Sequence, residues 1–377
     1  MKRQYEEPIH ILHFTTKLGT GGVQSFLTNY AEHMDPKRVV FDFAVQTNEE
    51  QRYDTEIRAL GGRIFSICSM TDSLTKYFCD VYCLCKEHPE ISAVHSHLNY
   101  RNIFPLLAAR LAGVPVRISH SHNAYEATSK VKEVARKIYR VFLPAFETQS
   151  WGCSEKANVW LYGERCKDTK VIHNAIPVQR YRFQDEIRTS IRQKLGIQNE
   201  DIVWVHVGTF GEAKNHKFLL ELFAEYLKKM GTAKLLLCGD GTLKTQIERQ
   251  IRDLNLEKNV ILLGMTDQVP GLLMAADVFV LPSLYEGLPL SIIEAQASGL
   301  PCIVSGAVPQ EAIFMENACV CDRFDTHIWC DAIEKMRSIC LNRGIGADRA
   351  QQAGYDIDTE AQKLQGIYLS LVRGNCK

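Results

Sequence analysis

The sequence lacks an excess of charge of either sign. Its 44 lysine and arginine residues balance 44 aspartate and glutamate residues, so no global field attracts nucleic acid or another polyanion. Hydrophobic residues make up 46% and charged residues 23% of the chain, which is the composition of an ordered globular protein. We therefore expect no nucleic-acid partner, and any anion site must be local.

The sequence also lacks an apolar run long enough to cross a membrane. The opening segment, MKRQYEEPIHILHF, places Glu6, Glu7 and Pro8 where a signal peptide has its apolar core. Thirteen cysteines are an odd number, and several lie in apolar segments such as KLLLCG. This pattern favours buried thiols in a reducing compartment over a disulfide framework. We expect a cytosolic chain.

Two groups of residues resemble metal ligands only superficially. Cys79, Cys83 and Cys85 in YFCDVYCLCKEH lack zinc-knuckle spacing, and we expect a helix whose positions 79 and 83 face its core. Asp356 and Asp358 in YDIDTEAQKL precede a helix, for which Asp358 is the expected N-cap. We therefore expect no metal and no cofactor.

Strand-length apolar runs alternate with helix-length amphipathic segments, which is typical of parallel sheets with crossover helices. The pattern occurs twice in 377 residues, more than one hydrophobic core usually serves. The first set of predicted strands covers 9–14, 40–45, 62–67, 93–97, 116–122 and 151–154. The second set covers 201–208, 233–239, 259–264, 277–282, 301–306 and 318–321.

The periodicity is lost between Thr169 and Phe183, and a charged helix, Ile187 to Leu195, leads into the second set of strands. We place the domain boundary in this segment. The sequence predicts an α/β fold of two Rossmann-like domains that face each other across a cleft, with ligands at the carboxyl ends of the strands.

A glycine loop follows the first predicted strand. In KLGTGGVQSFLTNYA, Gly21 and Gly22 precede an amphipathic helix, whose first amides and positive dipole end suit a phosphate. The dinucleotide fingerprint G-x-G-x-x-G fails because Gln24 stands at its third glycine, which disfavours an NAD-dependent dehydrogenase. A tight turn that only reverses the chain is the alternative for this loop.

Two further loops follow predicted strands in the second half. GTFGEAKNHKF places Lys214 in a glycine-flanked turn, where it is a candidate phosphate contact. CGDGTLKTQIE turns from strand to helix through Gly239, Asp240 and Gly241. This turn fits contact with the base or ribose of a nucleotide, or simply a helix start.

Two glutamates, Glu286 and Glu294, stand eight positions apart in YEGLPLSIIEAQASG. A glycine and a proline break the chain after Glu286, and residues 290–298 have the composition of a helix packed against the following strand. Glu294 then lies about two turns deeper, so one site could use both carboxylates. The alternative is that Glu294 belongs to a polar stripe that faces water.

This pair of glutamates resembles the signature of the family 4 retaining glycosyltransferases of the GT-B fold, especially the bacterial exopolysaccharide and capsule enzymes. Other segments occur in the order found in such enzymes: ILHFTTKLGTGGVQSFLTNY, VHSH, HSHN, CSEKANVWLYG with VIHNAIP, KNHKFLL, CGDGTL and DVFVLPS. The resemblance spans nearly the whole chain. It implies an acceptor-side domain, 1–180, and a nucleotide-sugar donor domain, 181–377, whose last helix, about 357–373, packs back on the first domain.

The resemblance implies a role for each matching position. Glu294 is expected to bind the donor ribose, and Glu286 the transferred sugar. Lys214 and His120 complete the implied catalytic set, with His120 facing the donor sugar and His122 as its rival. The implied donor-binding residues, which include the helix-start amides that stabilise a departing diphosphate without a metal, are Gly21, Gly22, Thr209, Lys214, Gly239, Asp240, Gly287, Leu288, Pro289, Leu290 and Glu294.

One position departs from the family pattern. An arginine usually follows the glycine at the end of the first donor-domain strand, and here that position is Thr209. A guanidinium clamps two phosphate oxygens, which a threonine cannot do. The diphosphate is then held less tightly, or His216 or Lys217 compensates, or activity is lost. We hypothesise that the chain remains an enzyme, because the other positions are present.

The segment SKVKEVARKIYRVFLPAF, residues 129–146, combines basic and apolar residues. Five basic residues stand against Glu133 alone, and Val134, Ile138 and Phe142 recur at helical spacing. We expect contact with an anionic membrane and a lipid-linked acceptor. The alternative is a core-facing helix with a solvated basic face.

The sequence thus predicts a retaining hexosyltransferase that moves a sugar from a nucleotide sugar, expected to be a UDP-sugar, to a hydroxyl acceptor on a glycan or lipid-linked sugar. We expect it to act in the cytoplasm at the inner face of the membrane, in exopolysaccharide, capsule or other cell-surface glycan synthesis. No covalent nucleophile stands out, which favours front-face transfer. The alternatives are a catalytically silent nucleotide-sugar-binding protein, suggested by Thr209, and a nucleotide-sugar epimerase of similar fold.

Overall fold

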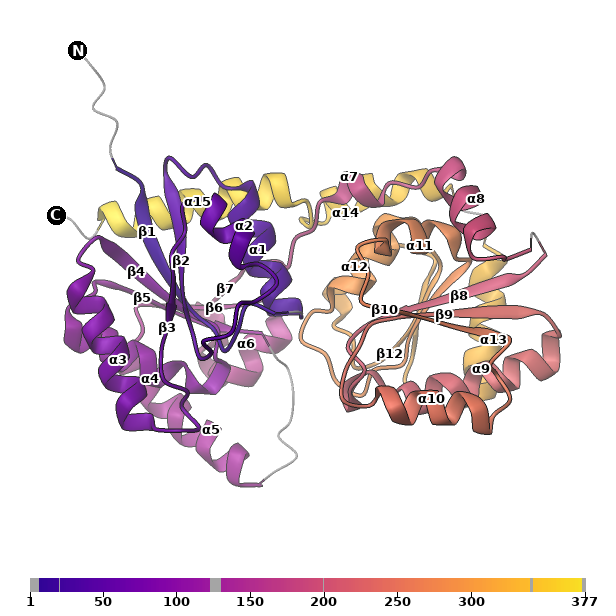
Figure 1. The fold of residues 1–377 in the computed structure, drawn as a ribbon, viewed down its shortest axis with the longest axis horizontal. Helices are drawn as coiled ribbons and strands as arrows, with labels where there is room; N and C mark the ends of the chain where they lie inside the picture. The colour runs from indigo at the N-terminus through magenta and orange to yellow at the C-terminus, as the bar shows by residue number, and fades with distance from the viewer. Residues whose placement is uncertain (1–6, 20, 123–129, 199, 340–341, 375–377) are drawn as a thin grey trace, which may run out of the picture. The chain divides into compact units, whose positions relative to one another are not determined.

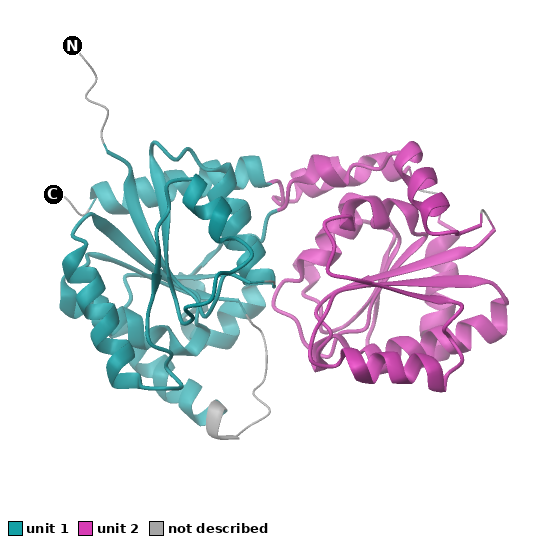
Figure 2. Cartoon of the chain, viewed as in Figure 1, with its two compact units in different colours: residues 1–175, 357–377 teal, residues 176–356 magenta. Residues whose placement is uncertain are grey.

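The computed structural model describes residues 7–19, 21–122, 130–198, 200–339 and 342–374. Some residues of the segments named above, such as Glu6, Asn123 and Ser129, lie outside these ranges. The chain forms two compact units (Figure 2), of which unit 1 comprises residues 1–175 and 357–377 and unit 2 comprises residues 176–356. The C-terminal helix therefore belongs to the same unit as the N-terminal strands.

Unit 1 is a seven-stranded parallel sheet in the order β3-β2-β1-β4-β5-β6-β7 (Figure 1). Its strands are β1 (Ile9–Phe14), β2 (Val39–Val45), β3 (Ile64–Ser66), β4 (Ile91–Ser96), β5 (Val116–Ser121), β6 (Gln149–Gly152) and β7 (Lys170–Val171). Its helices are α1 (Gly22–His33), α2 (Asp54–Ala59), α3 (Leu74–Glu87), α4 (Ile103–Ala112), α5 (Lys130–Phe142), α6 (Glu155–Tyr162) and α15 (Ile357–Gly374), with short 3-10 turns at Asn99–Asn102, Leu143–Ala145 and Gly163–Asp168.

Unit 2 is a six-stranded parallel sheet in the order β10-β9-β8-β11-β12-β13. Its strands are β8 (Ile202–Val207), β9 (Ala233–Cys238), β10 (Val260–Gly264), β11 (Val278–Leu281), β12 (Cys302–Ser305) and β13 (Ala318–Cys321). Its helices are α7 (Val178–Tyr181), α8 (Asp185–Lys194), α9 (His216–Met230), α10 (Lys244–Asp253), α11 (Val269–Ala275), α12 (Leu290–Ala297), α13 (Thr326–Arg337) and α14 (Gly346–Gln352), with 3-10 turns at Glu212–Lys214, Gln310–Ala312 and Arg343–Ile345.

The two Rossmann-like sheets confirm the predicted fold class, and each is covered by helices on both faces. In unit 1, Ile11 packs into a core with α1, α2 and α15, whereas the next residue, Leu12, packs with α3, α4 and α6. Successive side chains point to opposite faces of a strand. This double burial explains why the strands read as nearly continuous apolar runs.

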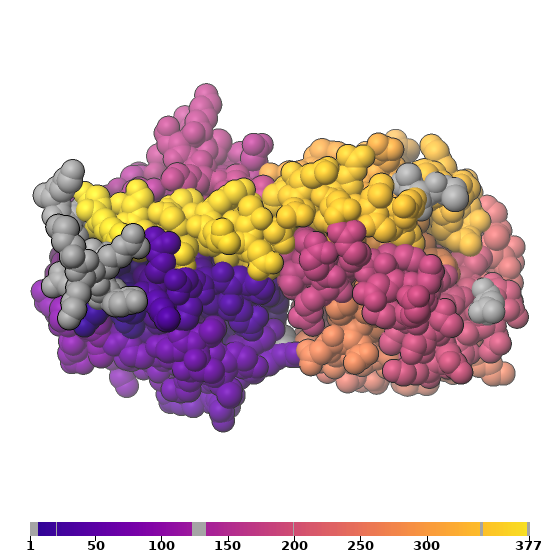
Figure 3. All heavy atoms as spheres, turned by 90° about the horizontal axis from the view of Figure 1, so that it is seen from above, coloured from indigo at the N-terminus to yellow at the C-terminus, as the bar shows by residue number. Residues whose placement is uncertain are grey.

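The C-terminal helix α15 is part of the core of unit 1. Leu364 and Tyr368 lie in the same buried cluster as Ile11 of β1, and the backbone N–H of Asp35 donates to the side chain of Gln365 at 2.8 Å. Figure 3 shows this helix, in yellow, lying over the indigo atoms of the N-terminal segment. The last helix thereby completes one face of the first sheet.

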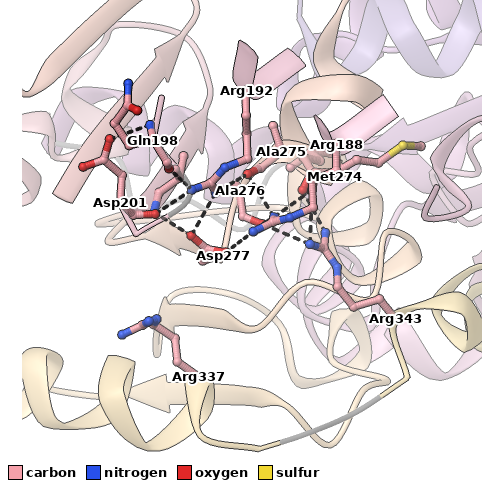
Figure 4. A network of polar contacts seen from close by, with 12 residues as sticks. Arg188, Arg192, Gln198, Asp201, Met274, Ala275, Ala276, Asp277, Arg337 and Arg343 are labelled. Atoms are coloured by element: carbon pink, nitrogen blue, oxygen red, sulfur yellow. Dashed lines mark hydrogen bonds and ion pairs between the residues drawn. The ribbon is translucent and has the colours of Figure 1, made fainter. Parts of the chain in front are cut away.

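An arginine network fastens α8 and α11 to the amino edge of the second sheet (Figure 4). Arg188 donates to the carbonyls that end α11, including Ala276 at 2.8 Å, and pairs with Asp277 at 2.6 Å. Arg343 donates to carbonyls of the same turn, including Ala276 at 3.0 Å. Cations at a helix C-terminus offset the negative end of its dipole. These arginines thus have a structural role at the edge opposite the loops that follow the strands.

Two local predictions are wrong. Cys79 and Cys83 are exposed, because the buried face of α3 is formed instead by Tyr77, Val81, Leu84 and Cys85. Asp358 is no N-cap, because α15 already begins at Ile357 and Asp358 lies inside its first turn. Neither change creates a metal site at these residues.

Helix α5 turns its apolar residues outward. Val134, Ile138, Val141 and Phe142 are between 49% and 73% exposed, and their spacing places them on one face. Arg136 is instead buried, where it pairs with Glu133 and donates to the carbonyl of Trp160. The alternative of a core-facing apolar face with a solvated basic face is therefore wrong for the described part of this segment.

Candidate active site

The loop after β8 carries Lys214 across the backbone of Gly208. A Cβ added at Gly208 would lie 2.9 Å from Cε of Lys214, so a side chain at this position would displace the lysine stem. Asn215, which follows Lys214, adopts a left-handed conformation with φ of 52° and begins the approach to α9. The sequence thus uses a glycine and an asparagine to direct the ammonium group to the carboxyl edge of the sheet.

The loop after β9 packs directly on the loop after β8. Gly239 has φ of 146°, and a Cβ on it would lie 1.9 Å from the carbonyl oxygen of Gly208. The backbone N–H of Phe210 donates to the carbonyl of Asp240 at 2.9 Å. The Asp240 carboxylate accepts the N–H of Gly241 and then contacts Lys244, and these interactions lower its pKa in that order. The two predicted loops therefore form one rigid platform.

Glu286 is paired with Lys214. Its Oε1 lies 2.5 Å from Nζ of Lys214 and accepts the hydroxyl of Ser283 at 2.6 Å. The two side chains are only 10% and 16% exposed, so their attraction is stronger than that of a solvated pair. The N–H of Leu284 also donates to the carbonyl of Ala213 at 2.7 Å. Two positions that are 72 residues apart in sequence thus meet at one point.

Glu294 lies on α12 and is held by a tyrosine. Tyr181, which is 8% exposed, donates its hydroxyl to Oε1 of Glu294 at 2.9 Å. The hydroxyl of Ser298 donates to the carbonyl of Tyr181 at 3.0 Å and fixes the tyrosine backbone. Ser291 and Ser298 are buried, so the predicted polar stripe does not face water. Burial raises the pKa of Glu294 to about 7, although Tyr181 and Arg180 oppose this shift.

The start of α12 supplies backbone donors near this region. The helix begins at Leu290 after Pro289, and no side chain of the described residues caps it. Leu288 is buried and Gly287 is partly buried. Proline has no N–H, so it cannot contribute one of the implied amides. The positive end of the helix dipole at Leu290 is nevertheless suited to an anion.

Thr209 is exposed beside the platform, and its carbonyl accepts the N–H of Gly211 at 2.8 Å. His216 cannot supply the missing charge, because it is 2% exposed and burial, followed by Lys214, lowers its pKa to about 4. Lys217 is exposed on the first turn of α9. Of the two proposed substitutes for the arginine, His216 is therefore excluded, and Lys217 remains.

In unit 1, Gly21 is the N-cap residue of α1 and Gly22 is its first residue. The side chain of Gln24 folds back to donate to the carbonyl of Lys17 at 3.1 Å, and its Oε1 would lie 2.7 Å from a Cβ on Gly21. A Cβ on Gly22 would meet no atom within 4 Å. The loop therefore presents a helix start without side-chain cover at Gly22.

His120 lies at the end of β5 and is fully buried. Asn102 aligns this strand end, because its amide donates to the carbonyl of His120 at 3.1 Å and to the hydroxyl of Ser119 at 2.9 Å. Burial, and then His122 and His13, lower the pKa of His120 well below the usual value. The neutral ring can act as a hydrogen-bond donor or acceptor but not as a cation. Its rival His122 is 7% exposed.

The structure thus brings Lys214 and Glu286 together, and it places Glu294 one helix turn beyond the α12 start. Ser283 and Tyr181, which hold the two glutamates, were not singled out from the sequence. Tyr181 lies 113 positions before its partner, and no periodicity links such distant residues. Tyr181 lies four positions after VIHNAIP and outside the segments that carry the family resemblance, so no signal in the sequence pointed to it.

We predict that Glu294 makes stability depend on pH between about 4.5 and 7. In this window the folded state keeps a proton that an unfolded carboxyl, with a pKa near 4.5, has already lost. Stability therefore falls as pH rises through the window, by on the order of 3 kcal/mol for this group. Glu294→Gln removes the proton exchange, so its free energy of unfolding, measured by urea titration, should fall less than that of the wild type.

Glu316→Gln, at an exposed glutamate of the same unit, is the matched control and should follow the wild-type pH dependence. Tyr181→Phe removes the donor that opposes the shift and should extend the window to higher pH. Equal pH slopes for the wild type and Glu294→Gln would show that this carboxyl titrates normally.

Comparison with known proteins agrees with this architecture. Residues 187–339 match the family model "Glycosyl transferases group 1". The putative glycosyltransferase EpsF of Bacillus subtilis is 37% identical over 308 residues, which cover 80% of each chain. An Escherichia coli UDP-Gal:alpha-D-GlcNAc-diphosphoundecaprenol alpha-1,3-galactosyltransferase is 34% identical over 223 residues, 56% of this chain and 57% of that protein.

Among solved structures, that of Anabaena Alr3699/HepE in complex with UDP and glucose matches with a TM-score of 0.78 at 19% identity, over 96% of this chain and 99% of that chain. This likeness confirms the predicted GT-B fold. With the sequence similarity to EpsF over most of both chains, it identifies the chain as a member of the group 1 glycosyl transferases.

Proposed function

We propose that the chain is a retaining glycosyltransferase of family 4 that transfers a sugar from a UDP-sugar to a hydroxyl of a glycan or lipid-linked acceptor. The observation that carries this proposal is the ion pair of Lys214 and Glu286, held by Ser283 at the sheet edge where α12 begins. A cation and a helix start suit a diphosphate, and a carboxylate suits sugar hydroxyls.

Departure of the nucleotide leaves negative charge on the diphosphate, and fixed donors stabilise that charge. Lys214 exchanges its carboxylate partner for a phosphate oxygen, and the Leu290 end of α12 adds its dipole. Glu286 then turns its carboxylate to the transferred sugar. We propose that these groups suffice without a metal, and that the departing phosphate helps to deprotonate the acceptor, with retention of configuration.

A nucleotide donor is supported by the ribose site, and the choice of UDP by the relatives. Glu294 offers a carboxylate whose Oε1 is held by Tyr181, which leaves Oε2 for the ribose hydroxyls. The HepE structure contains UDP and glucose, and the Escherichia coli relative carries UDP-Gal and a diphosphoundecaprenol-linked sugar in its name. We extend the UDP-linked donor and the lipid-linked acceptor to this chain as a proposal. We also propose a role in exopolysaccharide, capsule or other cell-surface glycan synthesis.

Helix α5 provides the support for a membrane-linked acceptor. Among the described residues no helix has the length and apolar character to cross a bilayer. The exposed apolar face of α5, with Val141 at 73% and Phe142 at 56%, is flanked by the exposed cation of Lys137. Such a helix suits the headgroup region of an anionic bilayer. We propose peripheral contact at the cytoplasmic face of the cell membrane.

Turnover with UDP-sugars tests the proposed function. UDP release from UDP-galactose, UDP-glucose and UDP-N-acetylglucosamine should be measurable with the wild type and should accelerate with a polyprenyl-diphosphate-linked sugar. NMR of the product should show the anomeric configuration of the donor. Thr209→Arg should tighten the KM for the donor about tenfold, because it adds a charge-assisted bond to the diphosphate.

Thr209→Val keeps the shape of threonine and adds no charge, so it is the control for Thr209→Arg. A wild type that turns over no UDP-sugar, with turnover restored by Thr209→Arg, would identify a catalytically silent binding protein. Conversion of the donor to a sugar isomer without acceptor would identify an epimerase instead.

Vesicle co-sedimentation tests the membrane contact. Wild-type protein should bind vesicles that contain phosphatidylglycerol at low salt and release them as salt rises. Val141→Glu with Phe142→Glu should weaken this binding about tenfold or more, because charges replace the inserted apolar surface. Val159→Glu, at a residue of α6 that is 55% exposed, should bind as the wild type does. Equal binding to neutral and anionic vesicles would remove the proposal.

A further inference from the structure

Five histidines are buried together at the carboxyl ends of three neighbouring strands of unit 1. His13 ends β1, His95 and His97 lie at the end of β4, and His120 and His122 lie at the end of β5. None is more than 7% exposed. Burial of polar rings costs free energy unless every nitrogen has a partner. The proposed transfer uses one ring of the five, His120, so the other four have no role in it.

The rings contact one another through their nitrogens. Nδ1 of His97 lies 2.8 Å from Nε2 of His122, and Nε2 of His97 lies 3.0 Å from Nδ1 of His13. Nε2 of His95 lies 3.0 Å from Nδ1 of His120. Within the described part of the chain, Nε2 of His120 is buried without a hydrogen-bond partner. A buried ring nitrogen therefore remains unsatisfied beside the pair formed by His97 and His122.

The rings are neutral, which is the form that binds a metal. Burial lowers the pKa of His122 to about 3, and burial followed by the neighbouring histidines lowers the pKa of His97 and His120 well below the usual value. A cation that enters the cluster thus meets lone pairs and no positive charge.

We propose that His97, His120 and His122 bind a divalent transition-metal ion of the Zn²⁺ type. One ring nitrogen of each lies within 4.8 Å of the other two. A tetrahedral ion holds nitrogens at about 2.0–2.1 Å, which separates its ligands by about 3.3 Å. The 2.8 Å pair is already near that spacing, and rotation of the stacked His120 ring brings in the third nitrogen. An all-imidazole set favours Zn²⁺, Cu²⁺ or Ni²⁺ over Mg²⁺ or Ca²⁺.

The alternative group of His13, His95 and His97 also has ring nitrogens within 4.8 Å of one another. Contacts with other side chains, however, hold the rings of His13 and His95 in place. The ring of His13 lies 4.1 Å from that of Phe41 and 5.4 Å from that of Phe43, and Nδ1 of His95 lies 2.7 Å from the hydroxyl of Tyr368. His122, at 7% exposure, is the most accessible ring of the five. Entry from its side therefore favours the group that contains it.

Binding requires no proton to leave the protein. One hydrogen now lies between Nδ1 of His97 and Nε2 of His122, and both nitrogens need a free lone pair to bind an ion. If His122 carries this hydrogen, a change of tautomer moves it to Nδ1 of the same ring. If His97 carries it, the hydrogen moves to Nε2 of His97, and the hydrogen now shared between that nitrogen and Nδ1 of His13 moves to Nε2 of His13. The reaction is then coordination alone, with the fourth position left for water.

The effect of a bound metal ion on transfer rests on the proposed function. A metal ion on His120 occupies the ring that is proposed to face the donor sugar, so Zn²⁺ should inhibit transfer and a chelator should restore it. Binding of the ion itself is independent of any transferase activity.

Metal content of the untagged full-length protein tests the proposal. After removal of metal with a chelator and dialysis against Zn²⁺, mass spectrometry should find about one Zn²⁺ per chain. His97→Gln and His122→Gln should reduce the Zn²⁺ content at least about tenfold, because each removes one of three ligands. His13→Gln and the exposed His327→Gln, in unit 2, should retain the ion, and circular dichroism should show that each variant is folded.

Co²⁺ provides a second measurement on the wild type alone, since tetrahedral nitrogen ligation gives visible absorption bands that aqueous Co²⁺ lacks. Absence of these bands, or loss of the dialysed Zn²⁺ from the wild type, would overturn the proposal even if a variant fails to fold. Loss of Zn²⁺ from His13→Gln with retention by His122→Gln would overturn the assignment of the ligands. Zn²⁺ binding by a protein that shows no transferase activity even after the metal is removed would leave the site intact and count against the proposed function.

Discussion

The ion pair between Lys214 and Glu286 is the interaction on which the candidate active site depends. Its two residues come from the loops after β8 and β11, which are joined where the N–H of Leu284 donates to the carbonyl of Ala213, and Gly208 leaves room for the lysine stem. The pair is largely withdrawn from water, so each charge needs the other until a ligand replaces it. A diphosphate is such a ligand for the lysine, and a sugar hydroxyl is one for the glutamate. The apoprotein thus holds both groups ready without leaving either charge unpaired.

The two units differ in where they place charged and neutral polar side chains. Unit 2 keeps a carboxylate, an ammonium group and the start of α12 at one edge of its sheet, and it uses arginines as structural ties at the opposite edge. Unit 1 instead buries neutral rings, and Tyr368 of the C-terminal helix reaches the histidine cluster through His95. The last helix therefore supports the chemistry of unit 1 as well as its core. The charged pair of the candidate site thus lies in unit 2, and the cluster of neutral rings lies in unit 1.

Much of the fold could be predicted because parallel strands buried on both faces read as apolar runs. All twelve predicted strands are present, and only β7, with two residues, was missed in the segment without periodicity. Lys214 and Glu286 could be predicted as site residues from their turns, but their contact could not, because it joins two loops that are 72 positions apart. Tyr181 and the histidine cluster were missed because tertiary packing alone unites these residues. The outward face of α5 could not be predicted either, since a helical period identifies an apolar face without saying whether it faces core or solvent.

UDP affinity in two charge-removing variants tests most directly whether the Lys214–Glu286 pair is a ligand site rather than a structural tie. Lys214→Met should weaken UDP binding about tenfold or more, because it removes a charge-assisted bond to the diphosphate. Glu286→Gln should leave UDP binding unchanged or tighten it, because the lysine no longer has a competing carboxylate. Calorimetric titration measures the UDP affinity of each variant independently. Their melting temperatures check that both are folded. Weaker binding by Lys214→Met without any weakening by Glu286→Gln is the predicted result. Equal weakening by both variants would show that the pair serves the fold and would contradict the account.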